Sequence, residues 1–397
     1  MADKRHKGFE TIETDYKQIN KQIKEHRKKI FRRIVEIAIL VILLLLIGKL
    51  VYSIRTYDDY EIKNTIRRDS TSVTKFEEYR DYILEYSNDG IQCIKKDGEL
   101  VWNQAFEMTT PVVEIRGEYL VVYDKGGTRI FILTEKGLQK EIETTSAIQT
   151  VCLAEQGSVA VLMREDNESQ IKLFDKKGSE LANGKFYDDK GSFPVDIALS
   201  WDAQKLAVSM IGVTGNEVGS SISFYNFGSV GQSEIDNNVG VYNIEGVVIP
   251  EIDYVSKDRM IAIGTGKVIV FAGNQKPEIE KEIDIPEKVL SSFYNEKYIG
   301  IVYDNPELES SWHVKVMDFN GKTIMETDTS IVYETVEFLS KNEICISNKT
   351  ECEIFTTHNI KKFSYVFDRE LYKIIAGENE QSYTFIFKET IEEVKLK

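Results

Sequence analysis

The chain has 397 residues, of which 42% are hydrophobic, and its net charge is −15. Residues 1–33 hold eleven Lys and Arg against five Asp and Glu, so this end carries +6 and the remainder carries −21. A surface that binds a nucleic-acid backbone must be basic, so the charge of the remainder excludes nucleic acid as its partner.

Residues 1–33 are predicted to be a basic cytoplasmic tail. Within residues 9–30, apolar and aromatic side chains recur at spacings that alternate between three and four, from Phe9 to Ile30. This heptad-like stripe is typical of a short helix that self-associates. It also fits an amphipathic helix that lies on lipid headgroups. A largely disordered basic tail is the third interpretation.

Residues 34–54 read IVEIAILVILLLLIGKLVYSI and are predicted to form a single transmembrane helix. A bilayer core requires ~20 residues of helix. The bases precede this segment and Asp58, Asp59 and Glu61 follow it, so the positive-inside rule places the N-terminus in the cytoplasm and the C-terminal part outside. A cleaved signal peptide is the competing interpretation, although no small-residue cleavage pattern follows Gly48.

After a polar linker at 55–75, residues 76–397 consist of short apolar runs that are rich in Val, Ile, Tyr and Phe and are bounded by Gly, Asp and Asn. Such runs predict strands. A turn before a more polar strand recurs every 38 to 50 residues; its members are Gly98, Gly137, Gly178, Gly228, Gly273, Gly321 and Asn359. Four short strands in each such unit are the signature of a β-propeller blade.

The predicted fold class is therefore all-β, a β-propeller behind one N-terminal transmembrane helix. Seven turns and one further three-strand piece favour eight blades, with the last blade completed by a strand from about 72–80. Seven blades result if the first hairpin merges into the last blade. A pair of β-sandwiches is the alternative fold, and the regular unit length weighs against it.

The four cysteines predict neither a zinc site nor a redox motif, because no CxxC is present and no His clusters with them. Cys345 and Cys352 flank a predicted hairpin turn, where a disulfide and two free buried thiols are both open interpretations. The Asp-Gly turns, such as Asp175–Gly178 and Asp318–Gly321, lack the alternating oxygen ligands of a calcium loop. Structural turns are expected there.

No catalytic, cofactor-binding or metal residue is predicted. The predicted exterior part contains two histidines, His313 and His358, and no GxSxG motif. A quinone cofactor would require recurrent Trp-bearing repeats, and the three Trp of the chain do not recur in that way. Acids are abundant, however, and a propeller gathers acids at the mouth of its channel, so carboxylate chemistry stays an alternative.

Several segments resemble a known family. They are DGIQCIKKDGELVW near the start of the repeats, IALSWDAQKLAVS and SISFYNFGSVGQ in the middle, and SSFYNEKYIGIVY further on. Together with the basic tail and the apolar segment, they are similar to a bacterial, clostridial-type family of unknown function. The resemblance implies single-pass membrane proteins with a WD40-like or PQQ-like propeller outside the cell. It implies no activity and no site residues.

The expected function is that of a binding module or scaffold at the bacterial cell envelope, anchored in the cell membrane by one span. Its expected partner is a protein or cell-wall material outside the membrane, with self-association through residues 9–30 as an additional contact. The alternative is a propeller enzyme, a hydrolase or lyase that uses carboxylates at the channel mouth. The two differ in whether acids converge at one mouth with pKa values that are pushed apart.

Overall fold

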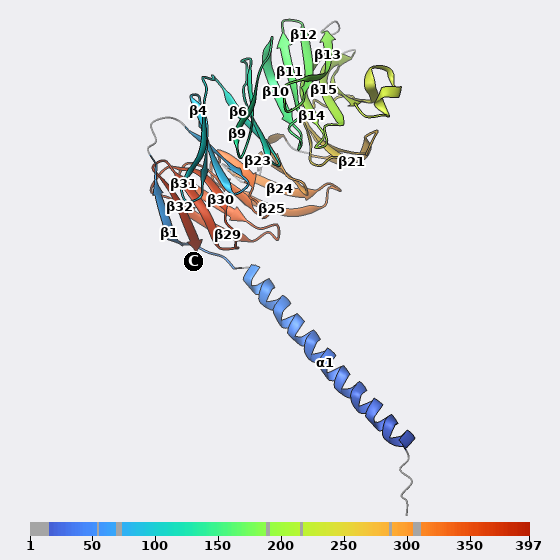
Figure 1. The fold of residues 1–397 in the computed structure, drawn as a ribbon, viewed down its shortest axis with the longest axis vertical. Coiled ribbons are helices and arrows are strands. Elements are labelled where there is room, and N and C mark those ends of the chain that lie inside the picture. The colour runs from blue at the N-terminus through green and yellow to red at the C-terminus, as the bar shows by residue number, and fades with distance from the viewer. Residues whose placement is uncertain are drawn as a thin grey trace, which may run out of the picture. The chain divides into compact units, whose positions relative to one another are not determined.

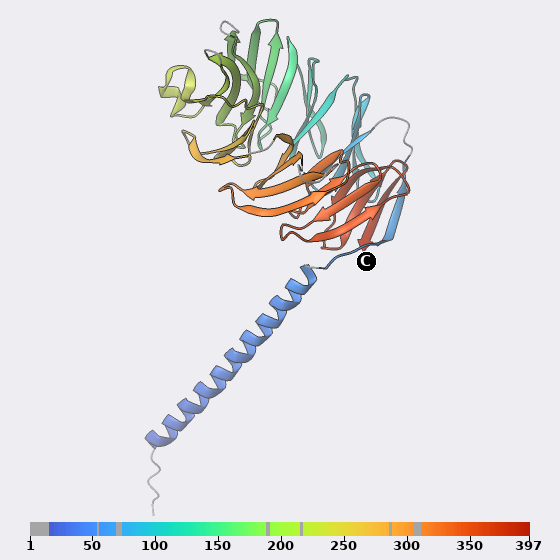
Figure 2. The same cartoon turned by 180° about the vertical axis from the view of Figure 1, so that it is seen from behind.

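The structure is a computed structural model, and it describes residues 16–53, 55–68, 74–187, 191–214, 217–285, 288–304 and 311–397. Two compact units divide the chain, Met1–Arg55 and Thr56–Lys397. The first contains the helix α1 (Tyr16–Ser53), and the second contains the strands (Figures 1 and 2).

Helix α1 includes residues 34–53 of the predicted span at 34–54, whereas residue 54 and the side chains of residues 46, 47 and 49–53 lie outside the described ones. Residues 1–15 of the predicted tail also lie outside the described part. Within the described residues, no helix is long and apolar enough to cross a membrane.

The described residues of the second unit form eight four-stranded antiparallel sheets, which are the eight blades of a β-propeller. Blade 1 contains β2 (Lys75–Tyr79), β3 (Tyr82–Ser87), β4 (Gly90–Lys95) and β5 (Leu100–Ala105). Blade 2 contains β6 (Pro111–Arg116), β7 (Tyr119–Asp124), β8 (Arg129–Thr134) and β9 (Gly137–Glu143). Blade 3 contains β10 (Ala147–Leu153), β11 (Val159–Glu165), β12 (Glu168–Phe174) and β13 (Glu180–Tyr187).

The remaining blades follow in chain order. Blade 4 contains β14 (Phe193–Leu199), β15 (Lys205–Thr214), β16 (Glu217–Asn226) and β17 (Asn238–Ile244). Blade 5 contains β18 (Glu251–Tyr254), β19 (Arg259–Gly264), β20 (Lys267–Ala272) and β21 (Glu278–Asp284). Blade 6 contains β22 (Val289–Tyr294), β23 (Tyr298–Asp304), β24 (Trp312–Asp318) and β25 (Thr323–Thr329). Blade 7 contains β26 (Thr335–Phe338), β27 (Ile344–Ser347), β28 (Glu351–Phe355) and β29 (Lys361–Val366). Blade 8 contains β30 (Leu371–Ala376), β31 (Ser382–Phe387), β32 (Thr390–Leu396) and β1 (Tyr60–Arg67).

The position of a strand in its blade explains its sequence. The first strands of neighbouring blades contact one another around the axis, as β14 and β18 do. The second strands are covered on both faces and are almost continuously apolar, as in β7, where Tyr119–Tyr123 are all buried. The fourth strands lie outermost and are largely exposed, as in β9, which explains why the predicted last strand of each unit is more polar.

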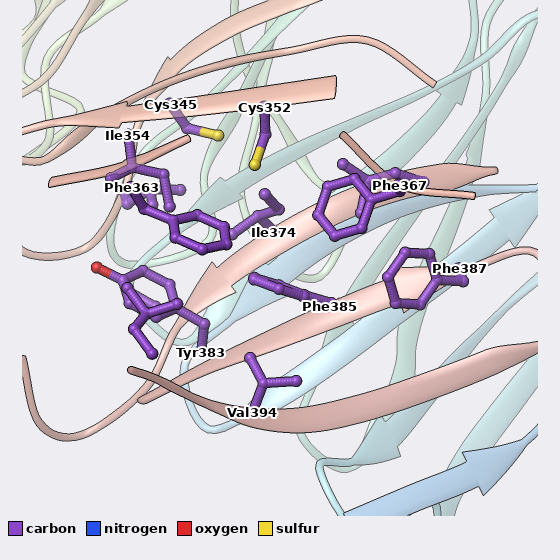
Figure 3. Packing of buried hydrophobic residues seen from close by; sticks show 14 residues of the cluster. Cys345, Cys352, Ile354, Phe363, Phe367, Ile374, Tyr383, Phe385, Phe387 and Val394 are labelled. Atoms are coloured by element: carbon purple, nitrogen blue, oxygen red, sulfur yellow. The ribbon is translucent and has the colours of Figure 1, made fainter. Parts of the chain in front are cut away.

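Eight apolar clusters hold the ring together, and each joins two neighbouring blades. Figure 3 shows the cluster between blades 7 and 8, where Phe363 and Ile354 face Phe385 and Tyr383. All four cysteines are free. Cys345 and Cys352 lie in this cluster, where they pair across the hairpin with Ile354 and Ser347 rather than with each other.

The ring is closed by β1, and the predicted closing strand at about 72–80 is wrong. β1 pairs antiparallel with β32, from Tyr60 opposite Leu396 to Arg67 opposite Thr390. The residues of β1 lie in the range that was predicted to be a linker. The strand is hard to recognise in the sequence because few of its side chains are buried: only Tyr60 and Ile66 are partly covered. The strand is therefore held by its backbone hydrogen bonds and by the packing of these two side chains.

Arg68, which follows β1, fastens the last blade to the first. Its Nη1 donates to the carbonyl oxygens of Phe387 and Lys388, each at 3.0 Å. Its guanidinium also forms an ion pair with Glu85 of β3 and lies 4.5 Å from the centre of the Phe76 ring. One side chain thus contacts both blades at the point where the ring closes.

Candidate functional site: the acidic half of the channel

The first strand of most blades carries a charged residue in an otherwise apolar segment, and several of these residues meet at the axis. They fall into two groups that we name by their charge. The lysine half comprises Glu77 of β2, Glu337 of β26 and Lys373 of β30. The acidic half comprises Glu114 and Arg116 of β6, Asp196 of β14, and Glu251 and Asp253 of β18.

In the lysine half, one ammonium group forms ion pairs with two carboxylates. The Lys373 Nζ lies 3.0 Å from Glu77 Oε2 and 2.7 Å from Glu337 Oε2. Burial alone would lower the pKa of Lys373, but the two carboxylates outweigh it and raise this pKa. The lysine therefore stays charged and joins blades 1, 7 and 8.

In the acidic half, the described residues provide four carboxylates and one guanidinium, that of Arg116. Asp196 Oδ2 accepts a hydrogen bond from the Ile252 backbone N–H at 2.8 Å, and Glu251 Oε2 accepts one from Ser292 Oγ at 2.5 Å. Arg116 Nη2 lies 3.5 Å from Asp253 Oδ1, which is a long contact. The positive charge is insufficient to balance the four acids.

The pKa values of these four acids are raised, chiefly by burial. Burial raises the pKa of Glu114 to about 7, and the charge of Asp253 adds to the shift while Arg116 opposes it. Burial also raises the pKa of Asp196 to about 7, against the effect of its backbone hydrogen bonds. The pKa values of Glu251 and Asp253 are raised for the same reason. All four carboxyl groups shift in the same direction.

Two residues of the acidic half, Arg116 and Asp253, line a cavity of about 350 Å³ at the end of the channel where the first and second strands of the blades connect. Arg116, Asp253, Trp201 and Tyr294 line it. The Arg116 guanidinium lies 5.0 Å from the centre of the Trp201 ring, and its buried Nε has no hydrogen-bond partner among the described residues. The cavity thus combines acidic and aromatic walls with one cation, the arrangement that binds polar or cationic groups.

The histidines lie elsewhere. His313 is on β24, where its ring nitrogens contact Asp328 Oδ1 at 2.6 Å and Glu326 Oε1 at 2.8 Å on the outermost strand of blade 6. His358 lies in the turn between β28 and β29. Over the described part of the chain, no group of three or more His, Cys, Asp or Glu is arranged to hold a metal ion.

The Asp-Gly turns are structural, as predicted. Asp175 Oδ1 accepts hydrogen bonds from the backbone N–H groups of Lys177 and Ser179, and Asp318 Oδ1 does the same two and four residues ahead. Ser200 and Asp202 likewise tie their turn through a 2.7 Å hydrogen bond. Most of the turn at 188–191 lies outside the described residues.

From the sequence we expected acids to gather at a channel mouth, but the sequence did not show which acids these would be. A usable signal was present: each of these acids stands among apolar residues in the first strand of a repeat, as Glu114 does in PVVEIR and Asp253 does in EIDY. The sequence does not show which acids share a counter-ion, because Lys373 reaches its partners from another blade.

The chain was compared with known proteins at the level of family, sequence and structure. Residues 53–396 match the family of unknown function DUF5711. The chain belongs to this family. A comparison with curated proteins returns no match. The expected propeller fold and the expected resemblance to a family of unknown function are confirmed, and the DUF5711 family itself assigns no activity to the channel.

Several solved structures are similar to this DUF5711 chain over most of its length. Sqt1 from Chaetomium thermophilum is similar with a TM-score of 0.52 and 11% identity, covering 85% of this chain and 100% of that one. BamB from Moraxella catarrhalis has a TM-score of 0.49 and 11% identity, with coverage of 85% and 100%. The Pan2 WD40 domain of Neurospora crassa has a TM-score of 0.48 and 8% identity, with coverage of 86% and 97%. At such identities the likeness concerns the fold alone.

Proposed function

We propose that this DUF5711 protein is a membrane-anchored, extracytoplasmic binding module or scaffold at the bacterial cell envelope. Its partner, a protein or cell-wall material, presents a cationic group to the acidic half of the channel. The observation that carries this proposal is the imbalance between Glu114, Asp196, Glu251 and Asp253 and their single cation, Arg116. A cation placed there would gain from carboxylates that lack a sufficient counter-ion.

The location is proposed from the sequence. The apolar segment 34–54, the basic residues before it and the acidic residues after it support one uncleaved span with the propeller outside. The basic tail would lie against the anionic inner leaflet, which attracts Lys and Arg near its surface. Self-association through residues 9–30 belongs to the same proposal.

The location can be tested by adding protease to intact cells that produce the full chain with a tag at each end. The proposal predicts loss of the C-terminal tag and survival of the N-terminal tag. Protection of the C-terminal tag in intact cells, with cleavage after lysis, would contradict the proposed orientation.

The scaffold role can be tested by proximity labelling from the propeller in cells. The matched control carries residues 1–55 fused to an unrelated propeller, so that anchor and tail are the same. The proposal predicts partners that are labelled by the native chain and not by the control, and that are lost with the double substitution Glu114→Gln and Asp253→Asn. Identical labelling by all three chains would refute the scaffold role.

A hydrolase or lyase is the second candidate, because an acid with a pKa near 7 can donate or accept a proton at neutral pH. Glu114 and Asp196 meet that condition. Acid–base pairs, however, require two groups whose pKa values are pushed apart, and the four acids shift together. Incubation with purified envelope glycans distinguishes the candidates: an enzyme releases products that Glu114→Gln abolishes, and a binding module releases none.

A further inference from the structure

Blade 4 departs from the repeat at the position where the first three blades turn into their outermost strand. In blades 1 to 3 a glycine with positive φ makes this turn, as Gly137 does in blade 2. In blade 4, the corresponding Gly228 is followed by an insertion that contains two short 3-10 turns, η1 (Gly231–Ser233) and η2 (Ile235–Asn237). The insertion is the yellow-green loop that stands out from the ring beside β15 in Figure 1. Insertions in single repeats often lie on a binding face.

The insertion lines a groove of about 620 Å³ between blades 3 and 4, a volume typical of ligand pockets. It contributes Gln232, Asp236 and Asn237 to the lining. Lys276 of blade 5 holds the insertion in place through a 2.8 Å ion pair with Glu234. The side chains of Gln232 and Asp236 form no hydrogen bond or ion pair with the described residues. Two polar groups on this fixed loop are thus available to a ligand.

Another part of the lining is aromatic, and a glycine leaves it open. The rings of Phe186 on β13 and Tyr225 on β16 both line the groove, with their centres 6.5 Å apart and their planes at 84°. Gly184 also lines it, on the same face of β13 as Phe186, and a Cβ there would lie 3.6 Å from the Phe186 ring. Gly184 has no positive φ and no bulge beside it, so the backbone does not require glycine. A glycine within a strand often marks a place where a ligand approaches closely.

The charges and polar groups of the lining narrow the class of ligand. Among the described residues that line the groove, Lys185 is the only cation, and its Nζ already lies 2.6 Å from Glu168 Oε1. An anionic ligand would therefore meet the free carboxylate of Asp236 and no free cation. A wholly apolar ligand would bury Asp236 and Gln232 without partners, which is costly. A neutral ligand with one apolar face and hydroxyl groups along its edge satisfies both walls, and a sugar ring has this form.

We propose that this groove binds a neutral oligosaccharide. One sugar ring places its C–H face on the open side of the Phe186 ring, over Gly184. Its hydroxyl groups donate hydrogen bonds to the Asp236 carboxylate and to the side-chain carbonyl of Gln232, and the bond to the carboxylate is the stronger of the two. The site lies on the outer strands of blades 3 and 4, so it does not depend on the acidic half of the channel.

Calorimetric titration of the full chain, in a neutral detergent that has no sugar head group, tests the proposal. The probes are the tetrasaccharides of N-acetylglucosamine, of β-linked glucose and of α-linked glucose, and at least one is expected to bind. Gly184→Ala fills the open side of the Phe186 ring and should weaken that binding by about tenfold, without lowering the midpoint of thermal unfolding. The matched control is Gly240→Ala on the outermost strand of blade 4, where a Cβ would lie 3.5 Å from the Tyr242 ring outside the groove. A wild-type chain that binds none of the three probes, or equal effects of the two substitutions, would overturn the proposal.

A second variant tests the polar wall without disturbing the fold. Asp236 has a φ of 54°, which glycine adopts readily, so Asp236→Gly removes the carboxylate and keeps the shape of the insertion. It should weaken binding of the same tetrasaccharide by about tenfold, since a hydrogen bond to a charged group is lost. The matched control is Asp166→Gly, an exposed aspartate with a φ of 47° in the turn between β11 and β12. Binding that Asp236→Gly leaves unchanged, or that Asp166→Gly weakens as much, would show that the sugar does not occupy this groove.

Discussion

The two halves of the channel are built from the same kind of residue in the same strand position, yet only in the lysine half does each carboxylate lie close to a cation. In the lysine half, Lys373 lies within 3.0 Å of a carboxylate oxygen from each of Glu77 and Glu337. In the acidic half, four carboxylates share Arg116, whose nearest contact to Asp253 is 3.5 Å. The comparison teaches that a charged residue on an inner strand is not by itself a site. What distinguishes the acidic half, where we propose that a ligand binds, is that its carboxylates lack close counter-ions.

The largest effect is expected from removing the cation of the lysine half. Lys373→Met leaves Glu77 and Glu337 facing each other without a partner, which should lower the free energy of unfolding by about 2–3 kcal/mol. Both carboxylates keep some contact with solvent, so the loss should lie at the low end of the range for buried pairs. Denaturant unfolding of the full chain in detergent measures it.

The control for that substitution is Lys349→Met. Lys349 pairs with Glu370 at 3.1 Å, but its side chain is 57% exposed. Surface pairs contribute less than about 1 kcal/mol. If Lys349→Met and Lys373→Met lowered the free energy of unfolding equally, Lys373 would stabilise the chain no more than a surface lysine does. The proposed difference between the two halves of the channel would then be wrong.

The next effect is a dependence of stability on pH. The pKa values of Glu114 and Asp196 are about 7 in the folded chain, above those of ordinary carboxyl groups. Between pH ~4 and ~7, the folded state therefore binds more protons than the unfolded state, and stability falls as the pH rises. The midpoint of thermal unfolding should drop by a few degrees between pH 5 and pH 8, since 1 kcal/mol corresponds to about 2–4 °C in a large domain. A midpoint that rises across this window in the wild-type chain would contradict the assignment.

A smaller effect is expected from neutralising one acid. Glu114→Gln removes a charge that burial disfavours, so it should stabilise the chain by about 1–2 kcal/mol at pH 8. At pH 5 the native carboxyl is already protonated, and the two chains should be nearly equal. Glu118→Gln, an exposed change on the adjacent turn, is the control. If Glu114→Gln stabilised the chain equally at both pH values, the titration of Glu114 would not be a cause of the pH dependence.

Much of the fold could be predicted because the apolar runs in the sequence recur with the period of the blades. The second strand of a blade is covered on both faces, so Tyr119–Asp124 is apolar throughout and is easily recognised. The turn residues Gly98, Gly137 and Gly321 adopt positive φ, and their recurrence marked the units. Seven such turns and one further three-strand piece favoured eight units over seven, and the described sheets confirm eight.

The closing strand was missed for a physical reason. β1 reads YEIKNTIR and is the outermost strand of its blade, so it buries little and resembles a polar linker. The alternation of Tyr60, Ile62 and Ile66 was a signal, but a bulge between Ile62 and Asn64 interrupts it, and Ile62 is exposed. The side chains of an outermost strand are mostly exposed, so their pattern gives only a weak indication that the segment is a strand.

The candidate site could be predicted only as a class. That acids would gather at a channel mouth follows from the topology, whereas their imbalance depends on contacts between distant residues. Lys373 and Glu77 are separated by 296 positions, and Arg116 and Asp253 by 137. No local sequence pattern shows which acids lie near the same cation, so only the structure reveals the acidic half.

The most direct test of the proposed binding site is a calorimetric titration of the full chain, in neutral detergent at pH 8, with hexalysine as the cationic probe. We expect hexalysine to bind, and the double substitution Glu114→Gln and Asp253→Asn to weaken binding by about tenfold or more, which corresponds to about 1.4 kcal/mol. Glu118→Gln should leave the affinity unchanged, and binding at pH 6 should be weaker because the acids hold protons there. Equal affinity of the double variant and the wild-type chain, or no binding by the wild-type chain, would contradict the claim that the acidic half is the binding site.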